Sequence, residues 1–167
     1  MRNWNELLPS SHIDTFTRDR LPPQDQWPVM IANRPELDYP DTLNAAVELV
    51  DRHVAAGRGH RPAMHGVTHI EPPSGEFSWT YAELQDKVNR IAQVLTIDMG
   101  LVPGNRILLR GGNSPMMAAT LLATLKAGLV AVPTMPLLRA GELATILDKA
   151  QVSTALCDSL LADELRH

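Results

Sequence analysis

The sequence has few aromatic side chains, a single cysteine and no long apolar run. Phe, Trp and Tyr make up only 4% of the 167 residues, so a folded core must consist mainly of aliphatic side chains. Cys157 has no partner for an internal disulfide, and nothing points to secretion. The apolar run at 116–125 is shorter than the ~20 residues that span a bilayer. Residues 1–8 contain no apolar signal segment, so we expect a cytoplasmic protein.

Clustered positive charge is also missing. The chain has 15 Lys and Arg residues against 19 Asp and Glu residues, which gives a net charge of −4. Binding to nucleic acid or to an anionic membrane surface depends on grouped Lys and Arg side chains. We therefore expect neither as a partner. The length is that of one domain with its own hydrophobic core.

The first 40 residues are rich in proline. Six of the 13 prolines lie within 1–40, and each removes a backbone donor and favours extended geometry before it. Apolar residues recur through the same segment, which is not typical of a disordered tail. We predict that residues 1–40 form an arm over the surface of a domain at 41–167, with only a short helix near 13–18.

Residues 41–98 alternate between helical and extended patterns. Apolar residues at helical spacing predict a helix that begins at Asp41 or Thr42 and ends near Gly57. Extended runs at 63–67 and 77–80 predict a β-hairpin with a long loop. The pair Thr80 and Glu83 forms a capping box, which predicts the start of a second helix. That helix would bury an apolar stripe formed by Leu84, Val88, Ile91, Ala92 and Leu95.

From residue 104 onward, strands alternate with helices. The pattern predicts strands at 106–110, 129–132 and 152–157, helices at 116–126 and 139–150, and a further helix at 159–165. Such alternation implies right-handed crossovers and a parallel sheet. We therefore predict an α/β fold with a three-layer βαβαβ core and a short parallel sheet, preceded by a β-hairpin and an irregular Pro-rich N-terminal arm. The helix at 116–126 is apolar nearly all round and should be buried on several sides.

Two positions could contact an anionic ligand at the carboxyl edge of this sheet. The GGN turn, Gly111–Asn113, lies between a strand and a helix N-terminus, where free amides can hold a phosphate. It lacks a dinucleotide or P-loop fingerprint, so a purely structural turn is the alternative interpretation. Arg139 follows the second strand and could meet an anion, or it could simply be solvated.

Other residues that often carry chemistry have simpler interpretations. His60, His65 and His69 lack the spacing and the Cys or Asp partners of a metal site, so we expect exposed histidines near the hairpin. Cys157 ends an apolar strand and is interpreted as a small buried side chain. Met116 and Met117 are expected to pack in the core.

Several blocks resemble adenylate-forming acyl-CoA synthetases, in the order in which that superfamily carries them. The block WTYAEL at 79–84 resembles the family's (L/W)-(S/T)-Y-x-E-L. The segment at 100–107 is similar to its GlxxGDxV turn and strand, with Asn105 where Asp is commoner. The block LKAGLVAVP at 125–133 resembles LKAGxxxVP. Similarity to the opening of 2-aminobenzoate-CoA and benzoate-CoA ligases is carried by residues 11–16, 21–28, 43–49 and 135–140.

The resemblance implies a parent enzyme that uses ATP and Mg²⁺ to convert a small aromatic carboxylic acid into an acyl-adenylate. Coenzyme A then displaces AMP to form the thioester. It also implies that 41–167 is the truncated N-terminal part of a large adenylation domain, because the family's phosphate loop and catalytic lysine have no counterpart here. No catalytic residue can be assigned, and we expect the chain alone to be inactive and to bind no cofactor tightly.

Some aryl-CoA ligases place a basic residue after the VP motif near the phosphates of coenzyme A. Leu137 occupies one such position and Arg139 a neighbouring one.

The sequence is also compatible with two other functions. The chain could be a free-standing flavodoxin-like module that binds an anion or a nucleotide at Gly111–Ser114. It could instead be a structural domain that associates with another copy as a homo-oligomer, through an open sheet edge or an apolar face.

Overall fold

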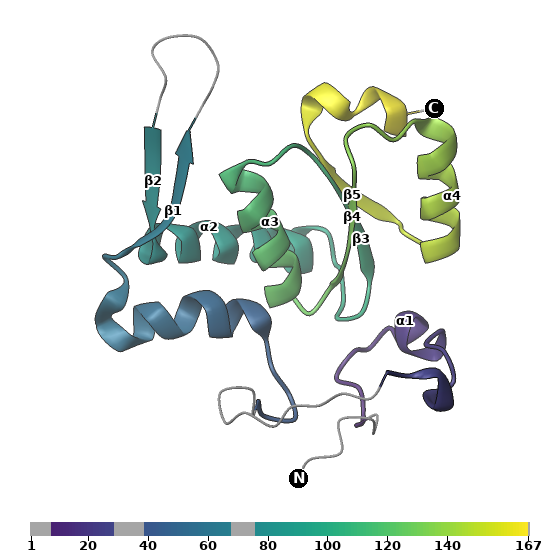
Figure 1. Cartoon of the computed structure of the whole chain (residues 1–167), viewed down its shortest axis with the longest axis horizontal. Helices are drawn as coiled ribbons and strands as arrows, with labels where there is room; N and C mark the ends of the chain where they lie inside the picture. The colour runs from purple at the N-terminus through teal and green to yellow at the C-terminus, as the bar shows by residue number, and fades with distance from the viewer. Residues whose placement is uncertain (1–7, 29–38, 68–75, 167) are drawn as a thin grey trace.

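The computed structural model describes residues 8–28, 39–67 and 76–166. Figure 1 shows a mixed α/β architecture with a three-stranded sheet and its helices on one side, and an antiparallel pair of strands on the other. Helix α2 (Tyr81–Gln93) lies between these two parts.

The parallel sheet has its first strand in the centre. Strand β3 (Arg106–Arg110) pairs on one side with β4 (Val130–Thr134) and on the other with β5 (Thr154–Cys157), all in parallel. The three aliphatic residues of β3, Ile107, Leu108 and Leu109, are all buried. A strand covered on both faces needs such a continuous apolar run.

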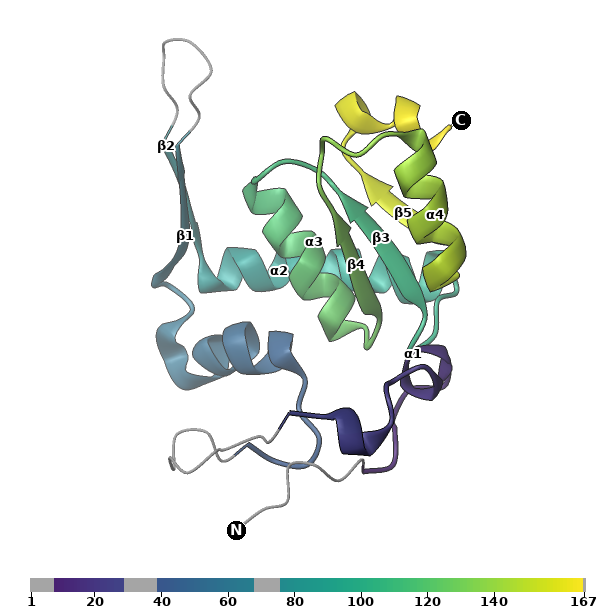
Figure 2. The same cartoon turned by 45° about the vertical axis from the view of Figure 1, so that its right-hand side comes forward.

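The two crossover helices lie on opposite faces of this sheet. Helix α3 (Pro115–Lys126) connects β3 to β4, and α4 (Ala140–Ala150) connects β4 to β5. The strand order β4-β3-β5 makes these connections run in opposite directions across the sheet. Right-handed crossovers then place the helices on different faces, and Figure 2 shows α3 and α4 on either side of the strands. The predicted α/β core is confirmed.

Helix α2 forms the layer behind α3 and continues as η5 (Val94–Asp98). Its start is the predicted capping box. The Thr80 amide donates to the Glu83 carboxylate at 2.8 Å, and the Glu83 amide donates to the Thr80 hydroxyl at 3.3 Å. Small residues of α3 allow close packing, and the buried cluster between the helices contains Val50, Leu84, Val88, Ala119 and Ala123.

The helix before the hairpin starts later than predicted. It contains two segments with wide π-type turns, η3 (Val47–Asp51) and η4 (Val54–Arg58). Its cap is Asn44, not Asp41 or Thr42, because the Asn44 side-chain oxygen accepts from the amides of Ala46 and Val47 at 3.1 and 3.2 Å. Gly57, at φ +74°, breaks the helical geometry in the last turn of η4, near the predicted end of the helix.

Two further expectations need correction. Helix α3 packs against both α2 and the sheet, but it is less completely buried than predicted, because Met116 and Leu121 are exposed. The predicted helix at 159–165 consists of two separate single turns, η6 (Ser159–Leu161) and η7 (Asp163–Leu165). Asp158 caps the first turn by accepting from the Leu160 amide at 3.0 Å. A continuous helix is therefore absent there.

The predicted hairpin is confirmed as β1 (Pro62–Val67) paired with β2 (Glu76–Thr80). Gly66 lies opposite Phe77, and any side chain at Gly66 would overlap the Phe77 ring. The Lys87 ammonium lies 4.7 Å from the Trp79 ring centre, which links the hairpin to α2.

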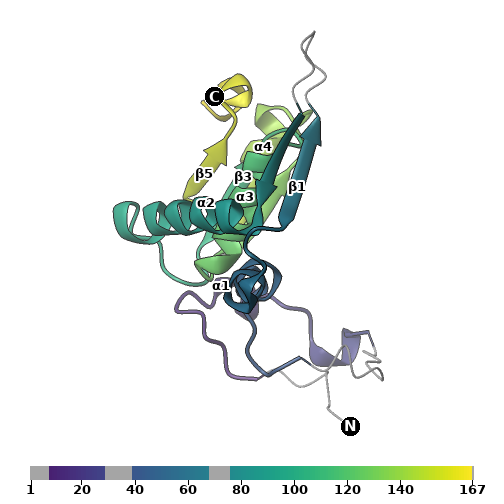
Figure 3. The same cartoon turned by 90° about the vertical axis from the view of Figure 1, so that its left-hand side faces the viewer.

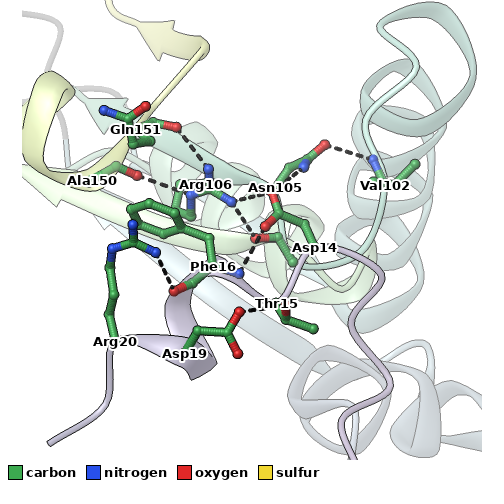
Figure 4. Close-up of polar contacts among 11 residues, drawn as sticks. Asp14, Thr15, Phe16, Asp19, Arg20, Val102, Asn105, Arg106, Ala150 and Gln151 are labelled. Atoms are coloured by element: carbon green, nitrogen blue, oxygen red, sulfur yellow. Dashed lines mark hydrogen bonds and ion pairs between the residues drawn. The ribbon is translucent and has the colours of Figure 1, made fainter.

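The described part of the N-terminal segment lies at the amino edge of the parallel sheet, at the opposite end of the molecule from the hairpin (Figure 3). It contains α1 (Phe16–Asp19) and η1 (Gln24–Gln26). Backbone amides of Ile13 and Asp14 both donate to the Pro103 carbonyl at 3.0 Å. The Asp14 carboxylate forms an ion pair with Arg106 and accepts from Asn105 at 2.8 Å (Figure 4). The segment is thereby fixed to the start of β3.

Candidate functional site at the carboxyl edge of the sheet

The loops that follow the three parallel strands meet at one edge of the sheet, away from the N-terminal segment. They contain the GGN turn after β3, residues 135–139 after β4 and residues 158–164 after β5. Ligands of open α/β sheets bind outside the carboxyl ends of the strands. The structure thus brings both predicted anion contacts, the GGN turn and Arg139, to the edge where such ligands bind.

A buried arginine joins two of these loops. The side chain of Arg110, at the end of β3, is 1% exposed. Its guanidinium donates to four backbone carbonyls, those of Met135 (2.8 Å), Pro136 (3.0 Å), Leu138 (2.8 Å) and Leu161 (3.3 Å). Sequence reasoning missed this residue, because a charged residue that ends an apolar strand usually faces solvent.

Arg139 is the last residue of the loop after β4, and its side chain reaches into solvent. Its side chain is 80% exposed, and its Nη1 lies 2.7 Å from a carboxylate oxygen of Glu164. The other Glu164 oxygen accepts from the Ala140 amide at 2.9 Å. The hydrogen bond from Arg139, and to a smaller extent that from the Ala140 amide, holds the pKa of Glu164 below its usual value. The same bond to Glu164 raises the pKa of Arg139.

The N-terminus of α4 is therefore already capped by carboxylates. Besides the Glu164 bond, the Arg139 amide donates to Glu142 at 2.9 Å. Negative side chains at this end of a helix interact favourably with its dipole. An anionic ligand could still use the outward N–H groups of the Arg139 guanidinium, but it would share them with Glu164.

The GGN turn offers less to an anion than its position suggests. Pro115 begins α3 and has no amide N–H, and the Ser114 hydroxyl accepts from the Met117 amide at 3.1 Å. Neither glycine has a positive φ. A side chain at Gly111 would overlap the terminal methyl of Met117, whereas Gly112 faces open space. This geometry favours the structural interpretation of the turn.

The remaining candidates add no further ligand contact to this edge. His60 and His65 are exposed, and His69 lies outside the described residues. No group of three His, Cys, Asp or Glu side chains that could hold a metal ion occurs within 8–28, 39–67 and 76–166. Cys157 is half-buried rather than fully buried, and burial raises the pKa of its thiol. The core prediction holds in part for Met117, which is partly buried against the core, but not for the exposed Met116.

An open cleft of about 970 Å³ lies at the opposite, amino edge of the sheet. It separates the N-terminal segment from the end of α3, and Ser11, His12, Thr42 and Leu129 are among its lining residues. Neither the GGN turn nor Arg139 lines it. The cleft is thus separate from the candidate site.

No helix in the described part of the chain combines the length and the apolar character needed to cross a bilayer.

Residues 51–167 match the AMP-binding enzyme family, and the chain belongs to that family. The acetyl-coenzyme A synthetase of Mycolicibacterium smegmatis is 41% identical over 88 residues, which cover 53% of this chain and 9% of that protein. The benzoate-CoA ligase of Thauera aromatica is 30% identical over 122 residues, which cover 73% of this chain and 22% of that protein. The family resemblance noted in the sequence blocks is confirmed.

A solved structure shows the same fold. The anthranilate CoA ligase AuaEII, in complex with anthranoyl-AMP, superposes with a TM-score of 0.63 at 20% identity, over 77% of this chain and 23% of that one. The chain spans about a tenth of the length of the acetyl-coenzyme A synthetases that it matches, with 9% and 13% for two of them.

Proposed function

We propose that residues 41–167 form the N-terminal part of a large adenylation domain in an ATP-dependent aryl-acid CoA ligase. Residues 1–40 would be an arm on that domain, the acid would be 2-aminobenzoate, benzoate or a close relative, and the enzyme would be cytoplasmic. The main support for the aromatic acid is the match to benzoate-CoA ligase, which extends over 73% of the chain. Acetyl-coenzyme A synthetases are more similar over a shorter stretch of 53%. Acetate is therefore the competing substrate.

In this proposal, ATP supplies the leaving group that makes a carboxylate electrophilic, Mg²⁺ offsets phosphate charge, and coenzyme A supplies the thiol. No three-residue ligand group for a metal occurs among the described residues, so none of them is assigned to Mg²⁺. The contribution of this chain is a binding edge. Its buried strand β3 supports the loops that carry Arg139 and Glu164.

Arg139 is the residue that we assign to coenzyme A. Its exposed guanidinium uses one nitrogen for Glu164 and keeps further N–H donors directed to solvent. Arginine and phosphate form charge-assisted hydrogen bonds, which are stronger than neutral ones. The nucleotide phosphates of coenzyme A are a matching partner. The contact would be exposed, so its contribution to binding should be modest.

The test uses the complete gene product that contains these residues. Acid-dependent pyrophosphate release and acyl-CoA formation are measured with 2-aminobenzoate, benzoate and acetate. We expect kcat/KM to be highest for an aromatic acid. A preference for acetate would overturn the aryl assignment, and the absence of acid-dependent turnover would overturn the ligase itself. The 167-residue chain alone is expected to be inactive in the same assays.

Self-association is a second candidate property, supported by apolar side chains at the carboxyl edge. Leu137 is 79% exposed and Leu160 is 90% exposed. Apolar side chains grouped on a surface favour association with another surface. Sedimentation of the 167-residue chain over a wide concentration range would detect a dimer, and a strict monomer would contradict this candidate.

A further inference from the structure

Strand β3 carries an arginine at each end, and both side chains serve the same face of the sheet. Alternate residues of a strand share a face, so Arg106, Leu108 and Arg110 point together. The Arg106 guanidinium donates to the carbonyls of Ala150 (3.0 Å) and Gln151 (2.9 Å), at the C-terminal end of α4. Arg110 binds the loop that leads into the N-terminal end of α4. The central strand thus holds α4 at both ends.

The surroundings of Arg110 are unusual for a buried charge. Within the part of the chain that the structure describes, the hydrogen-bond acceptors of its guanidinium are all main-chain carbonyls, with no carboxylate among them. A buried charge is tolerated only when its hydrogen bonds are made. The guanidinium is planar and rigid, so its directed donors fix the loop after β4 relative to the turn after β5.

The two loops that Arg110 binds also carry the exposed ion pair of Arg139 and Glu164. The Leu138 carbonyl, which Arg110 binds at 2.8 Å, belongs to the residue before Arg139. The Leu161 carbonyl belongs to the turn that precedes Glu164. Glu164 in turn binds both the Arg139 guanidinium and the Ala140 amide. The position of the Arg139 guanidinium therefore depends on both loops that Arg110 joins.

We infer that Arg110 is a positioning residue for the coenzyme A step, because it holds the loop of Arg139 and the turn of Glu164 in one fixed arrangement. This inference rests on the proposed function. Arg110 does not reach solvent, so we assign it no direct contact with a substrate. It acts through the backbone of its neighbours, and its effect should appear in the binding of coenzyme A and not in acyl-adenylate formation.

The experiment compares Arg110→Lys and Arg110→Met with Arg106→Lys in the complete gene product. The control lies on the same strand and also binds carbonyls, but at the opposite edge. We expect Arg110→Lys to raise the KM for coenzyme A about two- to fivefold, which is up to the whole contribution of an exposed Arg139 contact. Acid-dependent pyrophosphate release should stay within about twofold of wild type, and Arg110→Met should have a larger effect than Arg110→Lys.

Hydrogen exchange supplies a second readout that needs no activity. Arg110→Lys should accelerate exchange in residues 135–140 and 160–166 together, while Arg106→Lys should accelerate it at 150–152. An unchanged KM for coenzyme A in an active Arg110→Lys enzyme overturns the inference, as does an equal rise in Arg106→Lys. A wild-type protein that makes no acyl-CoA overturns the proposed function instead. In that case the exchange data still decide whether Arg110 couples the two loops.

Discussion

The guanidinium of Arg139 lies 2.7 Å from the carboxylate of Glu164, a residue 25 positions further along the chain. The cation that we assign to coenzyme A therefore already has an anionic partner. Because this pair is exposed on the arginine side, an incoming phosphate would meet both the attraction of Arg139 and the repulsion of Glu164.

The first prediction follows from this competition. Glu164→Gln keeps an oxygen for the Ala140 amide but removes the negative charge beside Arg139. We expect the KM for coenzyme A to fall about two- to fivefold, as for loss of an exposed ion pair. Steady-state kinetics of thioester formation measure it. Asp163→Asn is the matched control, because it removes a negative charge from the neighbouring residue, which pairs with Arg166 and not with Arg139. A constant KM in Glu164→Gln would remove Arg139 from the coenzyme A site, whereas a rise would show that positioning of Arg139 by Glu164 outweighs the repulsion of the phosphate.

The second prediction concerns the stability of the N-terminal segment at acidic pH. The Phe16 amide, followed by Arg106, lowers the pKa of Asp14, and Arg139 lowers that of Glu164. Each folded-state pKa is below its unfolded value, so the stabilisation is complete above the unfolded pKa and is lost as the pH falls through the folded pKa. We therefore expect the N-terminal segment to loosen at acidic pH. Exchange of the Ile13 and Asp14 amides, corrected for the intrinsic rate, should rise as the pH falls below about 4. The Asp14→Asn variant should already show fast exchange at neutral pH, and a pH-independent opening in wild type would contradict the prediction.

The third prediction tests an ion pair that joins three helical segments. The Asp51 carboxylate accepts from the Lys126 ammonium at 2.7 Å and from the Gln85 amide group at 2.9 Å. Both charged side chains are largely buried. We expect Asp51→Ala to lower the free energy of unfolding by about 1.5–3 kcal/mol, measured by urea titration. The control is Asp86→Ala, whose exposed pair with Arg90 should contribute less than about 1 kcal/mol. A loss in Asp51→Ala no larger than the control's, below about 1 kcal/mol, would show that the Asp51 contacts stabilise the fold no more than an exposed pair does.

The fourth prediction separates backbone strain from a steric clash. Gly100 and Gly104 both have positive φ, at +66° and +94°. A side chain at Gly104 would overlap the Asp14 carbonyl oxygen, whereas Gly100 has nothing within 4 Å. Alanine at either position should cost roughly 1–2 kcal/mol of left-handed strain. Only Gly104→Ala should also release the N-terminal segment, seen as faster trypsin cleavage after Arg18 and Arg20. Equal cleavage of the two variants would show that close packing at Gly104 is unimportant.

Features determined by neighbouring residues were predictable from the sequence. Strand β3 has the predicted bounds, because a short aliphatic run between polar residues is sufficient to define it. The Thr80 and Glu83 capping box is also local, since each side chain binds the other's backbone. Both features depend on residues no more than a few positions apart.

Features that depend on distant contacts were not predictable in this way. Asp41, Thr42 and Asn44 are all good helix caps, and Asn44 is the cap in the structure. Its side-chain nitrogen also donates to the carbonyls of Leu125 and Lys126, more than 80 residues away. The carbonyl ligands of Arg110 and the pairing of Arg139 with Glu164 likewise join loops that meet only when the sheet is assembled. Arg139 itself could be singled out as a coenzyme A contact only through the family resemblance.

The central position of β3 has a consequence for synthesis. A chain emerging from the ribosome releases β3 before either of its neighbours, so both edges of this apolar strand stay open until residues 130–134 and then 154–157 appear. Open strand edges pair readily with other chains. The residues that hold the N-terminal segment, Pro103 and Arg106, emerge with β3 itself, so docking of that segment can precede closure of the sheet. The arrival of β5 is the event that ends the exposure of β3 to mispairing.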